Sequence, residues 1–377
     1  MNPRLARCLG GGAVAVSLAM SLLSAACAPD HGGAYPRAFA EAARAETAGR
    51  MREASEGYDA AAKVAVRDRD RDHALYLSGL TLLRSGDVRD GVAKLGAIAR
   101  ASPPREESPD AAYRVAAARI DHGDAARGWA EMEQVFVRFA GDGVAHAALK
   151  RVLVHLDETK GKAGAYDYLA RLEATPAGSS GVGELILFEA AERLAALGRY
   201  AQAHDMFLNV ATRWPYPFGA LWDDSLFRAS EMDESLGHIA HGIADLERML
   251  QDRETTSLTG SYQRPRMSPA LLRIAKLYAD GLHDNGHARE ALHRFYTDFT
   301  TSRARPTALW LEAELFREDA DAGQSCDRLR VLVKEFPDSR YVPCASNVCG
   351  EVQRPAKSAA PNTCHAYLML PHRFSAN

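Results

Sequence analysis

The chain has 377 residues and a formal net charge of −3 at pH 7, with 46 basic and 49 acidic side chains. A charge so close to balance gives no general attraction to nucleic acid or to an anionic membrane surface. The length would hold two or three ordinary domains, whereas an array of stacked repeats can lengthen without dividing. A hydrophobic content of 47%, rich in alanine, and the lack of any strand-rich stretch predict an all-α fold.

Residues 1–26 have the three parts of a secretory signal peptide. Two arginines precede an apolar run at 9–23, and small residues then lead to Cys27. The ending Leu-Ser-Ala-Ala-Cys resembles the bacterial lipoprotein box, which implies that Cys27 is lipidated and anchors the chain. Ala28 resembles the outer-membrane sorting signal, with the repeats then in the periplasm. The alternative is an ordinary signal peptide cleaved nearby, with Cys27 incidental.

A helical hairpin is most evident at residues 187–215. Gly198 marks a turn, and Ala203 is small enough to let the second helix pack closely on the first. Phe207 and Val210 follow on the same helical face, and a proline at 215 ends the helix. This arrangement resembles one tetratricopeptide repeat, which consists of two antiparallel helices in about 34 residues.

The same pattern recurs through the chain. The expected turns lie at Gly49, Gly86, Gly123, Lys160, Gly198, Gly237, Gly286 and Ala320. Five positions after each turn stands a small residue, namely Ala54, Gly91, Gly128, Ala165, Ala203, Gly242, Ala291 or Ser325. Four further on stands a bulky one, namely Tyr58, Leu95, Met132, Leu169, Phe207, Leu246, Phe295 or Leu329. The resemblance to the tetratricopeptide family implies a right-handed α-solenoid of about eight degenerate hairpins.

The repeats suggest a division of the chain into five segments. After the signal peptide we expect a tether at 27–34 and a first array of four repeats at 35–180. A second array with a capping helix would occupy 181–350, and an irregular tail 351–377. The Gly- and Ser-rich stretch 175–183 separates the two arrays, and we interpret it as a possible hinge.

Four cysteines lie in the last repeat and the tail, at Cys326, Cys344, Cys349 and Cys364. An even number in an exported chain predicts two disulfides. Of the three pairings we favour Cys326–Cys344 with Cys349–Cys364, which would tie the last repeat to the cap and the cap to the tail. A zinc site formed by Cys344, Cys349, Cys364 and His365 is the alternative, although its spacing matches no recognised zinc motif.

The sequence offers no constellation that indicates catalysis. It contains no phosphate-binding glycine loop, no nucleophile elbow and no His-Glu-x-x-His motif. The pairs His238/His241 and His283/His287 have helical ligand spacing, but we see no evident carboxylate partner and interpret them as surface histidines. We therefore expect no enzymatic activity, catalytic residue, metal, cofactor or small-molecule substrate.

An aromatic side chain stands at the fifth position of the first helix in six of the eight repeats, and lysine in the other two. In the tetratricopeptide family this position lines the concave groove, where rigid rings can anchor a peptide. The alternative is that the rings pack within the repeats. The row consists of Phe39, Tyr76, Tyr113, Lys150, Phe188, Phe227, Lys276 and Trp310.

Charged residues of both signs accompany the C-terminal part of this row. They are Arg273, Lys276 and Arg317 against Glu231, Glu234, Asp280 and Glu314. The mixture favours a protein or peptide partner over nucleic acid.

The segment 334–341, Lys-Glu-Phe-Pro-Asp-Ser-Arg-Tyr, together with the lipoprotein start, resembles two families of envelope repeat proteins. One is the repeat lipoprotein of the outer-membrane β-barrel assembly machine, and the other the Tol–Pal-associated periplasmic repeat protein. The resemblance implies a non-enzymatic, membrane-anchored scaffold that binds another envelope protein. The alternatives are a helical accessory subunit of a peptidoglycan enzyme and a purely structural spacer.

Overall fold

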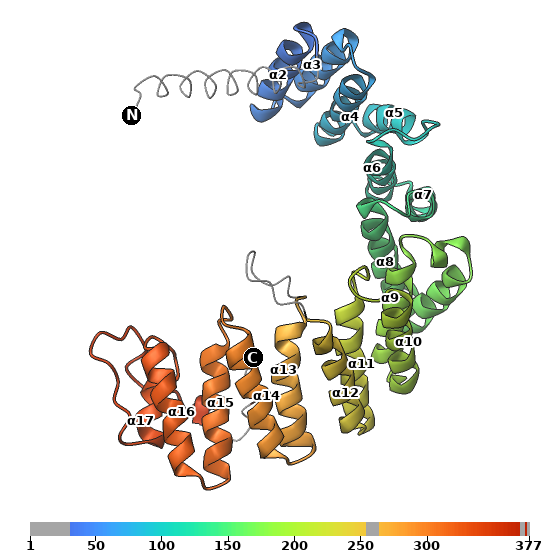
Figure 1. Cartoon of the computed structure of the whole chain (residues 1–377). Coiled ribbons are helices and arrows are strands. Elements are labelled where there is room, and N and C mark those ends of the chain that lie inside the picture. The colour runs from blue at the N-terminus through green and yellow to red at the C-terminus, as the bar shows by residue number, and fades with distance from the viewer. Residues whose placement is uncertain (1–30, 254–263, 370–373, 375–377) are drawn as a thin grey trace, which may run out of the picture. The chain divides into compact units, whose positions relative to one another are not determined.

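The computed structural model describes residues 31–253, 264–369 and 374, and in these residues it is all-α, as expected (Figure 1). The predicted signal peptide at 1–26, Cys27 and the tether up to residue 30 lie outside the described residues. No helix among the described residues combines the length and the apolar character needed to cross a membrane. The chain divides into two compact units, residues 1–152 and 153–377.

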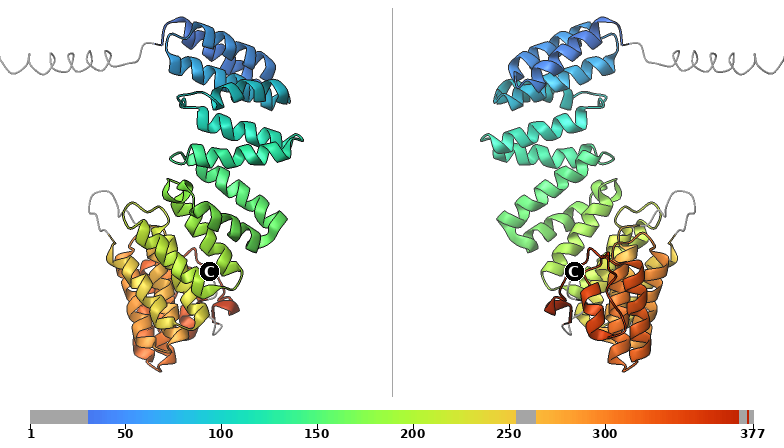
Figure 2. Two further views of the ribbon diagram at one scale, coloured as in Figure 1. Left: turned by 90° about the vertical axis from the view of Figure 1, so that its right-hand side faces the viewer. Right: turned by 90° about the vertical axis from the view of Figure 1, so that its left-hand side faces the viewer.

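Helical hairpins make up the first unit. Its helices are α2 (Ala34–Thr47), α3 (Met51–Val64), α4 (Asp68–Arg84), α5 (Val88–Ala99), α6 (Ser108–Asp121) and α7 (Ala125–Arg138), and it ends within α8 (Gly143–Glu173). From α2 to α7 each helix packs against the next along the chain (Figure 2). Every helix can therefore bury its apolar stripe against a sequence neighbour, as a repeat array requires.

The second unit continues the same architecture. Its helices after α8 are α9 (Gly183–Ala196), α10 (Tyr200–Arg213), α11 (Trp222–Leu236), α12 (Ile239–Gln251), α13 (Met267–Lys276), α14 (Asn285–Asp298), α15 (Arg305–Glu318), α16 (Ala322–Glu335) and α17 (Val342–Val348). Short helical turns η1 (Pro176–Ser179), η2 (Leu277–Gly281) and η3 (Ala366–Met369) complete it. Figure 1 shows α13 to α16 as adjacent antiparallel helices.

Small residues in the second helix of each hairpin allow the close helix packing that the sequence predicts. Every small and every bulky residue of the two expected series is buried. At Gly128 an added Cβ would lie 2.7 Å from the backbone nitrogen of Ile120 on the facing helix, so only glycine fits there. In the seventh hairpin Asp298 is exposed, and the neighbouring Phe299 is buried in the core.

Most of the predicted turns are confirmed, and two are corrected. Gly49, Gly86, Gly123, Gly198, Gly237 and Ala320 all have a positive φ. The fourth turn lies at Gly161 (φ 67°) rather than at Lys160, because glycine reaches the left-handed region without a Cβ clash. The seventh lies at His283 (φ 54°), since η2 extends the first helix and Gly286 falls inside α14.

The boundary between the two units differs from the expected division near residue 180. The stretch 175–183 lies inside the second unit and forms η1, with Ala177, Gly178 and Val182 buried. Arg213 Nη2 on α10 donates a hydrogen bond of 3.1 Å to the Gly178 carbonyl. These contacts place the stretch against the neighbouring hairpin.

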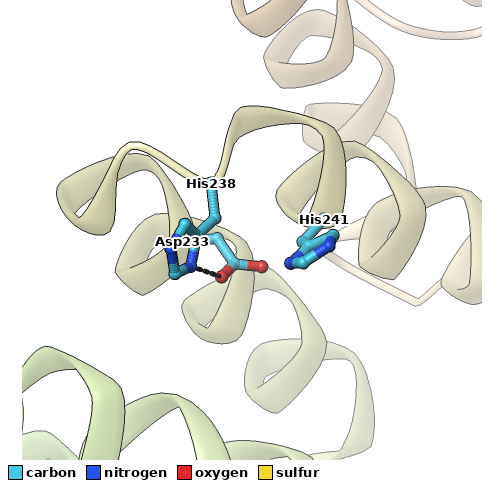
Figure 3. A group of neighbouring side chains, drawn as sticks. All are labelled: Asp233, His238 and His241. Carbon is cyan, nitrogen blue, oxygen red and sulfur yellow. Dashed lines mark ion pairs between the residues drawn. The ribbon is translucent and has the colours of Figure 1, made fainter.

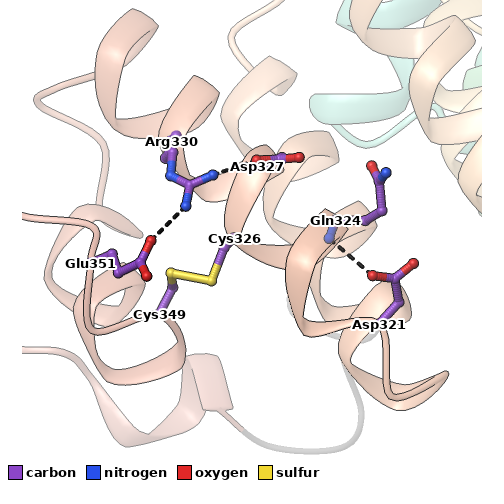
Figure 4. Close-up of a disulfide and its surroundings, with 7 residues drawn as sticks. All are labelled: Asp321, Gln324, Cys326, Asp327, Arg330, Cys349 and Glu351. Carbon is purple, nitrogen blue, oxygen red and sulfur yellow. Dashed lines mark hydrogen bonds and ion pairs between the residues drawn. A yellow bond between two sulfur atoms is a disulfide. The ribbon is translucent and has the colours of Figure 1, made fainter.

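The expectation of two disulfides is confirmed, but the pairing that we favoured is wrong. Cys326 pairs with Cys349, and Cys344 pairs with Cys364. Because α17 packs on α16, Cys349, which follows α17, is brought beside Cys326 (Figure 4). Cys344 in α17 instead meets Cys364 in the tail. With all four sulfurs oxidised, the alternative zinc site has no thiolate ligands.

The tail closes the apolar end of the second unit. Val352, Ala360 and Leu368 are buried in the same core as α15 and α16. Arg330 on α16 adds a polar link, since its guanidinium donates to Glu351 at 2.7 Å (Figure 4). The last repeat is thus covered by the tail and held to it by two covalent bonds.

We predict that replacing Cys344 and Cys364 by serine lowers the free energy of unfolding by about 2–4 kcal/mol, as expected for a loop of this size. Urea denaturation under non-reducing conditions would measure the change. Peptide mapping without reduction should recover Cys326 linked to Cys349. Recovery of Cys326 linked to Cys344 would contradict the structure.

Candidate functional site

The aromatic row of the first unit consists of Phe39 on α2, Tyr76 on α4 and Tyr113 on α6, followed by Lys150 on α8. The three rings are half-buried, and Lys150 is exposed. The Phe39 ring lies edge-on to Tyr58, 5.3 Å between centroids, and stacks on His73 of α4 at 5.9 Å. Each ring in the row therefore contributes to the core with one part and leaves another part accessible.

Tyr76 and Tyr113 carry polar groups at the surface of this row. The Tyr76 hydroxyl donates a hydrogen bond to Asp110 on α6, which joins two successive first helices. The same carboxylate accepts a 3.3 Å bond from Arg114, whose guanidinium lies 5.9 Å from the Tyr113 centroid. Half-buried tyrosines beside charged groups can present both apolar area and hydrogen-bonding groups to a partner.

In the second unit the row consists of Phe188 on α9, Phe227 on α11, Lys276 on α13 and Trp310 on α15. Phe188 lies edge-on to Phe207 of the same hairpin, with centroids 5.4 Å apart. Trp310 is 2% exposed and stacks on Tyr341 at 5.3 Å, so its ring belongs to the core and has no surface for a partner. The other three side chains are half-buried.

The charged residues beside this part of the row pair with one another. Glu234 on α11 accepts hydrogen bonds from Arg273 (2.6 Å) and Lys276 (2.7 Å) on α13. Burial favours a raised pKa for Glu234, but the two cations outweigh it and hold the pKa below its usual range. Phe227 lies between Arg266 and Arg273, whose guanidinium carbons are 5.1 and 5.5 Å from its centroid. The ion pairs link successive first helices and leave a surface of mixed charge.

Contrary to our interpretation of the sequence, a carboxylate lies beside the histidines at 238 and 241. Figure 3 shows the Asp233 carboxylate between the two imidazole rings. His238 Nδ1 lies 3.6 Å from Asp233 Oδ1, and Asp245 stands four residues after His241 on α12. His204 Nε2 on α10 lies 3.4 Å from Asp233 Oδ2 and 3.5 Å from Asp245 Oδ2. We refer to the side chains around Asp233, namely His204, Asp233, His241 and Asp245, as the histidine–aspartate cluster.

Two features separate this cluster from the other histidine pair. Asp233 is buried and comes from the preceding helix, a contact that sequence spacing does not reveal. The sequence did offer one sign of a carboxylate near these histidines, because Asp245 follows His241 by four residues and so lies on the same face of α12. His287, by contrast, bonds the exposed Asp284 at 2.6 Å, and His283 forms the turn, so that pair is divided as expected.

Glu312 on α15 is the most deeply perturbed carboxyl group near the row. It is 3% exposed, and burial raises its pKa to about 7 even though Arg328 Nε lies 3.0 Å from Oε1. Its Oε2 has no hydrogen-bond partner among the described residues. The carboxylate is therefore held in the core at an energetic cost that depends on pH.

Comparison with known proteins supports the repeat interpretation. Residues 307–339, which contain α15 and α16, match the family model described as tetratricopeptide repeat. No curated protein sequence matches the chain. The chain is therefore an all-α protein that contains a tetratricopeptide repeat.

Several solved structures are similar to this one at low sequence identity. A tetratricopeptide repeat protein from Parabacteroides merdae aligns at 12% identity over 71% of this chain and 93% of its own, with a TM-score of 0.32. The protein PilF from Pseudomonas aeruginosa aligns at 15% identity over 62% and 94%, with a TM-score of 0.37. The Naa15/Naa10 structure bound to HypK-THB aligns at 16% identity over 74% and 39%, with a TM-score of 0.40.

We predict that Glu312→Gln stabilises the protein more at pH 8 than at pH 5. The folded pKa of Glu312 is about 7 and the reference value is 4.5, so the folded state binds this proton more tightly. The wild type then loses stability as the pH rises through this interval, by roughly 2–3 kcal/mol between pH 5 and pH 8, whereas glutamine does not titrate.

Urea denaturation of both chains at the two pH values would measure this difference. Glu290→Gln, which alters an exposed carboxylate on the neighbouring helix α14, is the control. Equal pH dependence in the wild type and Glu312→Gln would rule out Glu312 as the titrating group.

Proposed function

We propose that this protein is a non-enzymatic scaffold, anchored in the bacterial envelope, that binds a protein or peptide partner along the aromatic row. The observation that carries the proposal is the repeated, half-buried aromatic side chain at one position of successive first helices. Partner segments bind such surfaces through rigid rings that lose little conformational freedom. In the first unit the proposed binding row consists of Tyr76 and Tyr113 with Lys150, and in the second unit of Phe188 and Phe227 with Lys276.

The proposed location rests on the N-terminal sequence and on the disulfides. Residues 1–26 have the composition of an export signal, and Cys27 follows it at the position of a lipidated cysteine. Two disulfides at the C-terminal end suit an oxidising compartment such as the periplasm. Outer-membrane attachment with a periplasmic repeat array agrees with both observations.

We predict that the double substitution Tyr76→Ala and Tyr113→Ala lowers the amount of partner captured by about tenfold or more. These two rings are preferable to Phe188, whose ring packs on Phe207 and whose loss would also disturb the hairpin. Chemical crosslinking in a bacterial host, followed by purification of the full-length chain, would measure capture. Phe218→Ala is the control, because it removes a 90% exposed ring outside the row.

Different results would support the alternatives. Equal capture by the wild type, the double variant and Phe218→Ala, with helicity unchanged, would contradict binding through the row. The absence of any specific crosslink would favour a structural spacer. Release of peptidoglycan fragments by the purified chain would favour a role in cell-wall metabolism.

We predict that Cys27→Ser releases the protein from the membrane fraction. A thioether to diacylglycerol requires the cysteine sulfur, and the apolar acyl chains supply the membrane affinity. Intact mass and membrane fractionation of both chains in a bacterial host would test this. A soluble wild type whose mature N-terminus lies elsewhere would contradict the anchor without affecting the proposal for the row.

A further inference from the structure

The histidine–aspartate cluster lies where three helices of the second unit meet. His204 comes from α10, Asp233 from the last turn of α11, and His241 and Asp245 from α12. The left-handed turn at Gly237 reverses the chain between α11 and α12, and so brings the last turn of one helix beside the first turns of the next. Residues far apart in the sequence thereby converge on one small volume.

Two carboxylate oxygens of the cluster are buried without a hydrogen-bond partner. Asp233 is 1% exposed, and Asp245 has a side chain that is 16% exposed. Neither Oδ2 atom has a hydrogen-bond partner among the described residues. Two anionic groups held together away from water need a positive charge between them.

His204 directs one ring nitrogen at these oxygens. Its Nδ1 lies 3.2 Å from Asp205 Oδ1. Its Nε2 faces Asp233 Oδ2 and Asp245 Oδ2. A carboxylate that holds the outer nitrogen of a histidine is the usual companion of an imidazole that binds a metal.

The separations match a metal ion better than a direct hydrogen bond. His204 Nε2 lies 3.4 Å from Asp233 Oδ2 and 3.5 Å from Asp245 Oδ2. A charged N–H···O bond would be about 2.7–2.9 Å. Tetrahedral zinc, with bonds of about 2.0–2.2 Å to nitrogen and oxygen, keeps its ligand atoms about 3.3–3.6 Å apart.

Three ligand atoms converge at this point. His204, Asp233 and Asp245 each place one ligand atom within 4.8 Å of the other two. Asp233 also belongs to a second such group, with His238 and His241, and Figure 3 shows its carboxylate between these two rings. His238 Nδ1, 3.6 Å from Asp233 Oδ1, is placed to orient the shared carboxylate.

The geometry points to a binding site for a divalent transition-metal ion of the zinc type, with His204, Asp233 and Asp245 as ligands. One imidazole and two carboxylates, with a water molecule in the fourth position, suit such an ion, which would neutralise the buried anionic pair. The bound metal would cross-link α10, α11 and α12, and so join the fifth hairpin to the sixth. This site is separate from the aromatic row and does not depend on the proposed partner.

The test is zinc binding by the full-length chain, purified without a polyhistidine tag and treated with a chelator. Competition with a chelating dye gives the affinity, and elemental analysis after desalting gives the stoichiometry. We expect one zinc ion per chain and a rise in melting temperature on adding zinc. Asp245→Asn and His204→Gln should each weaken binding by about tenfold or more. The matched control is His146→Gln, an exposed histidine on α8, which should bind as the wild type does.

Two further readouts separate metal binding from damage to the fold. Without metal, Asp245→Asn should be at least as stable as the wild type, because it removes one of two buried like charges. His241→Gln, which replaces an exposed histidine beside the site, should bind zinc as the wild type does. The proposal is overturned if the wild type retains no zinc, or if Asp245→Asn binds zinc as tightly as His146→Gln.

Discussion

The close approach of two helices at a small residue is the constraint on which this structure depends. In each hairpin a glycine, alanine or serine of the second helix touches the first helix, and the bulky residue one turn later fills the space between them. At Gly128 there is no room even for a methyl group. Repeating this contact builds a core that grows with length, so a chain with little sequence regularity can still form a regular array.

The first helices have a second kind of contact, made by aromatic rings and ion pairs. Their rings pack partly into the core, and charges such as Glu234 with Arg273 join one first helix to the next. The same residues therefore stabilise the array and form its candidate binding surface. Trp310 stands at the same position of its helix but serves the core alone, because Tyr341 stacks on its ring and leaves it buried.

The second unit concentrates features that a simple repeat does not need. It contains the two disulfides, the buried Glu312 and the histidine–aspartate cluster. The disulfides and the tail cover the core of the last repeat. The cluster instead joins two neighbouring hairpins through polar groups, which are costly to bury unless a positive charge compensates them. The disulfide-linked tail covers an apolar core, whereas the histidine–aspartate cluster lies between helices that already pack on one another.

The sequence alone determined the helical hairpins, their small and bulky contact residues, most of their turns and the presence of two disulfides, because each depends on residues close together in the chain. It could place the aromatic row on one helical position, but not say how much of each ring remains exposed. Only the tertiary structure decided that Cys326 meets Cys349, and that Asp233 and His204 join His241 and Asp245. Those partners come from different helices, and their meeting depends on how the helices pack rather than on any spacing along the chain.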